Sequence, residues 1–374
     1  MSKTICHQLI VGILCVSAGA RGADSPAKFL GANSCASSGC HGGGGAKQNQ
    51  FLVWSLQDFH SQRPTATLTT ARSKQIAAAL EIKDPSDDAR CTACHAPLHD
   101  VPENLRGENF RVSEGVTCES CHGPAENWLR SHTRHDFTRA DRTATGMRDL
   151  QNLYVRANTC VACHQVVSLP LLKAGHPELI FELDGQSVAA PKHWSAGKNG
   201  NGAQAWLVGQ AVALREMSWQ LVQLPGGLEL NQRRLETNLL ERIGSVSWVL
   251  HQAVPDAPRD KKFPEDYESV QSWADKLAKE KSEAVWTDEM AHKILFTLAA
   301  SVESFRDTAV SNLTHARRAE RLVLALDRLL VAENNHQADA ELNELFKLAQ
   351  SVPDFDPPQF AAALGKFSAA LLAK

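Results

Sequence analysis

The sequence predicts a mainly α-helical protein, with an N-terminal region of short helices and loops and a C-terminal antiparallel helical bundle. Three observations support this fold class. Four short cysteine–histidine motifs fall before residue 200, and no cysteine follows it. Beyond residue 200, apolar residues recur with the 3.6-residue period of amphipathic helices. Between the two parts lies the glycine-rich run Gly197–Gly202, which is typical of a linker.

Residues 1–20 are typical of a secretory signal peptide. Lys3 supplies a positive charge, an apolar stretch follows over residues 9–16, and Ala18, Gly19 and Ala20 form a small-residue cleavage site. We therefore expect export to the periplasm, with one mature domain over residues 21–200 and a helical domain over residues 201–374. No later apolar stretch approaches the length of a membrane span, so we expect no stable membrane insertion.

The predicted helices follow from the positions of apolar residues along the chain. In the N-terminal region, the clearest helical pattern covers residues 70–81. In the C-terminal region, Leu322, Leu326, Leu329 and Leu330 share one face of a helix. The breaks between such patterns contain proline or glycine and are short, which favours an antiparallel bundle. Similar patterns predict helices over residues 204–223, 229–253, 284–309, 337–351 and 358–373.

Four runs place two cysteines before an adjacent histidine: CASSGCH, CTACH, CESCH and CVACH. The C-x-x-C-H run is the attachment sequence for c-type haem, in which both thiols form thioethers with the porphyrin and the histidine binds the iron. The sequence therefore predicts four c-type haems, although the first run has a wider loop between its cysteines. The predicted attachment residues are Cys35, Cys40, Cys91, Cys94, Cys118, Cys121, Cys160 and Cys163, and the adjacent iron ligands are His41, His95, His122 and His164.

Zinc binding is the alternative interpretation of the cysteine pairs. Structural zinc sites combine two such pairs and do not require histidine directly after the second cysteine. Here histidine follows every pair, and the two cysteines outside the motifs, Cys6 and Cys15, lie in the predicted signal peptide. Haem attachment thus accounts for every remaining cysteine. Porphyrins would then replace much of a side-chain core, so we expect this region to fold only with its haems in place.

The motifs and their neighbourhoods resemble the tetrahaem cytochrome c-554 family over about residues 30–200. The most specific piece is GVTCESCHGPA at Gly115–Ala125, and further pieces are Trp54 with His60 downstream and FELD at Phe181–Asp184. The resemblance implies an electron-transfer protein in which three irons carry a second histidine on the distal face. It assigns His60 to the haem of His122, His132 to the haem of His41 and His193 to the haem of His164.

The second haem, that of His95, decides between two hypotheses. In the resembled family, this iron has no protein ligand on its distal face. His176 either closes that position here or competes with His193 for the fourth iron. His99 follows His95 too closely to reach the opposite face of the same haem. Two further candidates are His135, as a substitute for His132 or a partner of a ligand, and Met147, as an axial thioether.

An iron with histidine on both faces can change its oxidation state but has no exchangeable position for a substrate. We therefore expect an electron carrier between periplasmic redox partners, and not an enzyme. The alternative is a haem enzyme that binds or reduces a small nitrogen oxide at a five-coordinate second haem. Ligation of the second iron by His176 would remove the site that this alternative needs.

The two parts of the chain differ in formal charge, which is +1 over residues 21–200 and −5 over residues 201–374. The acidic helical part suits a docking surface for a basic redox partner, because complementary charge raises the rate of encounter. It would equally suit a module that tunes one haem, or one that covers exposed haem faces. The chain has no basic excess, so we expect no nucleic-acid partner.

Overall fold

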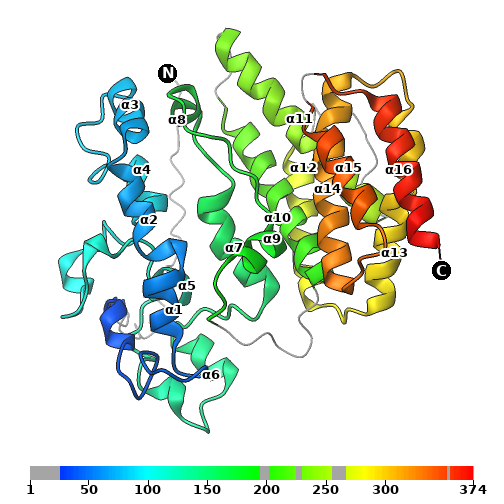
Figure 1. Cartoon of the computed structure of the whole chain (residues 1–374). Coiled ribbons are helices and arrows are strands. Elements are labelled where there is room, and N and C mark those ends of the chain that lie inside the picture. The colour runs from blue at the N-terminus through cyan, green and yellow to red at the C-terminus, as the bar shows by residue number, and fades with distance from the viewer. Residues whose placement is uncertain (1–25, 194–201, 225–229, 255–266, 352–353, 374) are drawn as a thin grey trace, which may run out of the picture.

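The computed structural model describes residues 26–193, 202–224, 230–254, 267–351 and 354–373. Over these ranges the protein is mainly helical, and its extended structure is limited to one isolated bridge between Phe29 and Arg106. Short helices make up the N-terminal region, and longer helices pack into a bundle in the C-terminal part (Figure 1). The predicted fold class is therefore confirmed. The predicted signal peptide and most of the predicted linker lie outside the described residues.

The N-terminal region consists of short helices joined by turns. The predicted helix over residues 70–81 corresponds to α3, which begins where the Thr70 side chain accepts a hydrogen bond from the Ser73 backbone amide. The longest helix here, α7, was not predicted. The residue before it, Asn152, is its N-cap, and the Asn152 side chain accepts hydrogen bonds from the backbone amides of Tyr154 and Val155. The helices are α1 (Gln50–Gln57), α2 (Phe59–Leu68), α3 (Ala71–Ala79), α4 (Ala89–His95), α5 (Cys118–His122), α6 (Arg139–Ala144), α7 (Leu153–His164), α8 (Leu169–Lys173) and α9 (Leu183–Ala189).

The C-terminal bundle contains the helices that the apolar patterns predict, with one addition and one division. The pattern over residues 284–309 is divided into α13 and a short 3-10 helix. Helix α12 was not predicted, because its many charged residues obscure the buried positions Ala274, Leu277 and Ala278. The helices are α10 (Gly202–Val222), α11 (Leu230–Ala253), α12 (Tyr267–Glu283), α13 (Asp288–Ala299), α14 (Asn312–Glu333), α15 (Asp339–Ala349) and α16 (Pro357–Leu372).

Helix α10 is the central element of the bundle and is buried along most of its length. It packs against α11, α12 and α14, and also against α7 and α9 of the N-terminal region. Val161 from α7 and Phe181 and Leu183 near the start of α9 belong to the same apolar core as Trp206 of α10. In Figure 1, α7 and α9 accordingly lie between the remaining short helices and the bundle. The bundle thus anchors the helix that carries the fourth cysteine–histidine motif.

Among the described residues, no helix combines the length and the apolar character that crossing a membrane requires.

Candidate functional site

One continuous cavity of about 2290 Å³ runs through the N-terminal region. Sites for a single small ligand usually enclose about 300–1,000 Å³, so this cavity is large enough for several cofactors. Its walls include all eight histidines that the sequence analysis names as iron ligands: His41, His60, His95, His122, His132, His164, His176 and His193. They also include every predicted attachment cysteine except the exposed Cys40.

Three of the four cysteine–histidine motifs lie on short helices that end at the histidine. Helix α4 ends at His95, α5 ends at His122 and α7 ends at His164. In each, the first cysteine is four residues before the histidine, and residues at this spacing share one face of a helix. One helix face therefore presents both the thiol and the imidazole to the cavity. The first motif lies instead in a turn, where the His41 backbone amide donates to the Cys35 carbonyl.

The four motifs lie in two adjacent pairs. The thiols of Cys35 and Cys118 interact, which lowers the pKa of Cys35 and raises that of Cys118, so the first motif lies next to the third. In the same way, the thiol of Cys163 lowers the pKa of Cys94, and the Cys163 sulfur contacts the Ala93 carbonyl, so the second motif lies next to the fourth. The ligand assignments that the resemblance implies require the same adjacency of the first and third motifs, because they give the histidine that follows each of these motifs to the haem of the other.

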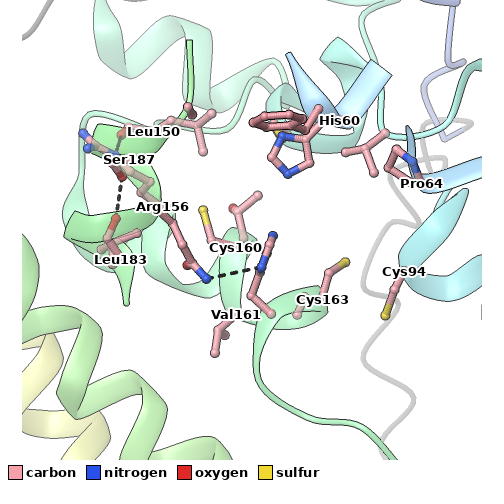
Figure 2. Close-up of a pocket in the computed structure, with 18 of the residues that line it drawn as sticks. His60, Pro64, Cys94, Leu150, Arg156, Cys160, Val161, Cys163, Leu183 and Ser187 are labelled. Carbon is pink, nitrogen blue, oxygen red and sulfur yellow. Dashed lines mark hydrogen bonds between the residues drawn. The ribbon is translucent and has the colours of Figure 1, made fainter. Parts of the chain in front are cut away.

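Two pairs of histidine rings lie at a centroid separation that suits a shared metal ion. Ring centroids are 6.1 Å apart for His41 and His132 and 5.9 Å apart for His60 and His164. Two imidazoles on opposite sides of one metal, each with a metal–nitrogen distance of about 2 Å, have centroids roughly 6 Å apart. Figure 2 shows His60 across this part of the cavity from Cys160 and Cys163 of the fourth motif.

The ring positions agree with one implied assignment and differ from another. His132 lies beside His41, as the resemblance implies. His60 lies beside His164 and not in the pair with His122 that the resemblance implies. Helix α2 contacts α4, which in turn contacts α7 with the fourth motif. The His60 carbonyl also accepts a hydrogen bond from the Val116 amide, just before the third motif. Iron ligation by any of these residues stays a prediction.

The remaining four histidines also fall into two neighbouring sets. Burial, followed by the charges of His193, His41 and His132, lowers the pKa of His122 to about 4. The charge of His193 also acts on Asp58. The pKa of His95 is lowered by burial and, further, by the charge of His176. The lowered pKa values keep His95 and His122 neutral near pH 7, and neutral imidazole is the form that binds a metal.

Most of these histidines hold one ring nitrogen in a hydrogen bond and leave the other free for a metal. The Nδ1 atom meets an oxygen in His41 (Gln50 Oε1, 2.9 Å), His60 (Asp58 Oδ1, 2.9 Å), His95 (the Pro64 carbonyl, 2.9 Å), His132 (the Trp128 carbonyl, 3.1 Å) and His176 (the Pro177 carbonyl, 2.8 Å). Metal-binding histidines characteristically donate their second N–H in this way, which fixes the ring and its tautomer. Gln186 contacts the Nδ1 atom of His164 at 3.3 Å.

The charge of the cavity wall suits cofactors that carry carboxylates, as haem does through its propionates. Cationic side chains in the wall outnumber carboxylates, and the Nε atom of Arg142 is buried without a hydrogen-bond partner. Burial lowers the pKa of Arg156, and the Nε atom of this residue donates a hydrogen bond to the Leu150 carbonyl. The cationic residues of the wall are Arg63, Arg72, Arg90, Arg139, Arg142, Arg148, Arg156 and Lys192. The residues present therefore fit several c-type haems.

Three other candidates from the sequence fall into different places. The two ring nitrogens of His99 face the carboxylates of Asp100 and Asp87, and the ring is not part of the cavity wall. His135 is exposed and also lies outside the wall. Met147 does contribute to the wall, in the turn after α6. The structure thus brings the eight named histidines together and leaves His99 and His135 apart.

The sequence analysis missed two buried carboxylates that position the site. Glu119, inside the third motif, accepts hydrogen bonds from the backbone amides of Leu30, Gly31 and Ala125 at 2.7–2.8 Å. It thereby ties the segment before the first motif to the third motif. Asp58 accepts from both the backbone amide and the ring of His60. The position of Asp58, two residues before His60, is the one sequence feature that could have indicated this contact.

Comparison with known proteins supports the resemblance over part of the chain. The family model described as cytochrome c554 and c-prime matches residues 34–123. This range contains the first three cysteine–histidine motifs and His60, whereas the fourth motif lies beyond it. No curated protein and no solved structure matched the chain. A domain of this family implies a multihaem electron carrier with c-type haems.

Proposed function

We propose that this chain, whose residues 34–123 form a cytochrome c554 and c-prime domain, is a periplasmic tetrahaem electron carrier. The observation that supports this proposal most strongly is the single cavity shared by four cysteine–histidine motifs and by eight histidines. Covalently bound haem supplies the reversible one-electron change that defines a carrier. The protein supplies the ligands, the spacing and the electrostatic surroundings that set the potentials.

In this proposal, each iron-binding histidine of a motif receives a second histidine from elsewhere in the chain. The ring separations support His132 for the iron of His41 and His60 for the iron of His164. The electrostatic influence of His193 on His122 supports that pair for the third motif. Histidine on both faces leaves no position for a substrate, and favours transfer of electrons over chemistry on a bound molecule.

Close contact between motifs supports rapid movement of electrons within the cavity. The paired thiols Cys35 and Cys118, and Cys94 and Cys163, place the attachment points of neighbouring haems next to each other. We further propose that donor and acceptor proteins deliver and remove the electrons. The acidic helical part, with a formal charge of −5 over residues 201–374, would attract a partner with a basic surface.

Coulometric redox titration of the exported holoprotein tests the proposed function. The expected result is the reversible uptake and release of about four electrons per molecule, spread over several potentials because neighbouring charges interact. Uptake of fewer electrons would mean fewer redox centres than proposed. Steady reduction of nitrite or nitric oxide by the isolated protein, at a rate that sustains turnover, would favour the enzyme alternative over the carrier.

The buried carboxylate beside His60 is expected to lower the potential of one haem. Asp58 bonds the Nδ1 atom of His60 at 2.9 Å and is itself buried. A carboxylate in this position raises the basicity of a ligating imidazole, which stabilises the oxidised iron. Asp58→Asn should therefore raise one of the four midpoint potentials by about 1 kcal/mol, or about 40 mV. Spectroelectrochemical titration measures this shift, and a uniform shift of all four potentials would contradict it.

A further inference from the structure

His176 lies in the loop between α8 and α9 and lines the cavity together with His95. His95 is hydrogen-bonded to Pro64 of α2, and the residue before His176 is hydrogen-bonded to Arg72 of α3, a helix that contacts α2. The two histidines therefore lie in the same part of the cavity, where the charge of His176 also acts on His95. His95 donates its Nδ1 hydrogen to the Pro64 carbonyl at 2.9 Å. His176 donates its own Nδ1 hydrogen to the Pro177 carbonyl at 2.8 Å. Both rings therefore keep the Nε2 atom available for a metal.

A side chain from α3 holds the loop that contains His176. Arg72 of α3 donates to the Gly175 carbonyl through Nη2 at 2.7 Å and through Nε at 3.3 Å. Gly175 has a φ of 102°, a conformation that side-chain-bearing residues rarely adopt. The backbone amide of His176 donates to the Leu171 carbonyl at 2.9 Å. These hydrogen bonds hold the backbone at Gly175 and His176 in place.

The other irons have candidate partners that leave His176 unassigned. His60 lies beside His164, and His132 lies beside His41. With the His176 loop bonded to α3, His193 is the remaining candidate for the third motif, and its charge also acts on His122. Of the eight cavity histidines, only His95 and His176 then remain to be matched. The fourth iron already has His60 as its candidate second ligand, so neither His176 nor His193 has to bind it.

We propose that His176 is the sixth ligand of the iron held by His95, and that Arg72 is the positioning residue for its loop. The inference rests on the proposed tetrahaem function and deepens it. With His176 in place, all four irons carry two histidines, and no open face remains for a nitrogen oxide. The chain would then differ from the family it resembles at the one haem where that family leaves a face open.

Low-temperature electron paramagnetic resonance and carbon monoxide binding on the purified holoprotein test this assignment. The wild-type protein should show only low-spin iron when oxidised, and should bind no carbon monoxide when reduced. His176→Ala should convert about a quarter of the iron to a high-spin form that binds carbon monoxide. The matched control is His135→Ala, which replaces an exposed histidine outside the cavity wall and should behave like the wild type.

Two outcomes would overturn the assignment: high-spin iron in the wild type at about a quarter of the total, or fully low-spin iron in His176→Ala. Arg72→Ala provides a test that leaves the ligand itself intact. In Arg72→Ala, carbon monoxide should bind the second haem in a fraction of the molecules. In Arg72→Lys, this fraction should be much smaller. Haem content separates failure of this assignment from failure of the proposed function. A wild-type protein with four haems and open iron contradicts only the role of His176, whereas a wild-type protein with fewer than four haems contradicts the tetrahaem function itself.

Discussion

Preventing haem attachment is expected to unfold most of the N-terminal region while the helical bundle stays folded. The cavity of about 2290 Å³ is lined by the attachment cysteines and histidines, so without haem the helices α1–α6 have little core to pack against. The bundle has its own core around α10. Cofactor binding of this kind is coupled to folding. Hydrogen–deuterium exchange of apoprotein, made without the haem-attachment machinery, should show lost protection over α1–α6 and retained protection over α10–α16.

The intermediate case in this experiment is α7, which carries the fourth motif and packs on α10. Val161 of α7 is buried in the bundle core, so partial protection of α7 is expected even without haem. The matched control is the same sequence exported and loaded with haem, in which all helices should be protected. Native-like protection of α1–α6 in the apoprotein would contradict the view that haems form the core of this region.

Arg321→Met should destabilise the protein by about 3–5 kcal/mol, because it leaves Glu182 buried without its partner. The Arg321 side chain is 1% exposed, and its Nη1 atom lies 3.1 Å from Oε1 of Glu182. This ion pair joins α14 of the bundle to the segment before α9. Burial raises the pKa of Glu182, and the charge of Arg321 opposes that rise. Urea unfolding of the holoprotein measures the change.

The control for this prediction is an ion pair of similar length on the surface. Arg306 and Glu303 are 2.7 Å apart and mostly exposed, so Arg306→Met should cost less than about 1 kcal/mol. The double variant Glu182→Leu with Arg321→Met should recover part of the stability that Arg321→Met loses, since it buries no unpaired charge. Equal effects of Arg321→Met and Arg306→Met would show that the Glu182 contact does not anchor the bundle.

The sequence predicted the elements of the site better than their arrangement. The cysteine–histidine motifs are local patterns with a fixed chemical meaning, so His95, His122 and His164 were identifiable without a structure. The distal candidates His60, His132, His176 and His193 were also named and line the cavity, whereas His135, the named substitute for His132, does not. Which ring faces which was not predictable, because the long loops between motifs permit several pairings. Helix α2 packs against α4, and α4 packs against α7, which brings His60 beside His164. The spacing of the residues along the sequence does not predict these contacts.

The bundle was predictable where apolar periodicity was strong and was missed where charge obscured it. Helices α10, α14 and α16 matched their patterns closely, whereas α12 has many charged residues around a narrow buried stripe. The continuous core between α7, α9 and α10 was not expected, since sequence analysis placed a boundary near residue 200. Whether the two parts also fold as separate domains stays a prediction.

The haem-to-polypeptide ratio of the exported protein, from the absorbance of its pyridine haemochrome and an independent protein assay, tests the central claim most directly. We expect a ratio of four with all haem bound covalently, because four motifs share the cavity and each offers a histidine ligand. A ratio of three, with normal attachment at the motifs of His95, His122 and His164, would mean that the wider first motif binds no haem. Haem that dissociates in acidified organic solvent would contradict c-type attachment altogether.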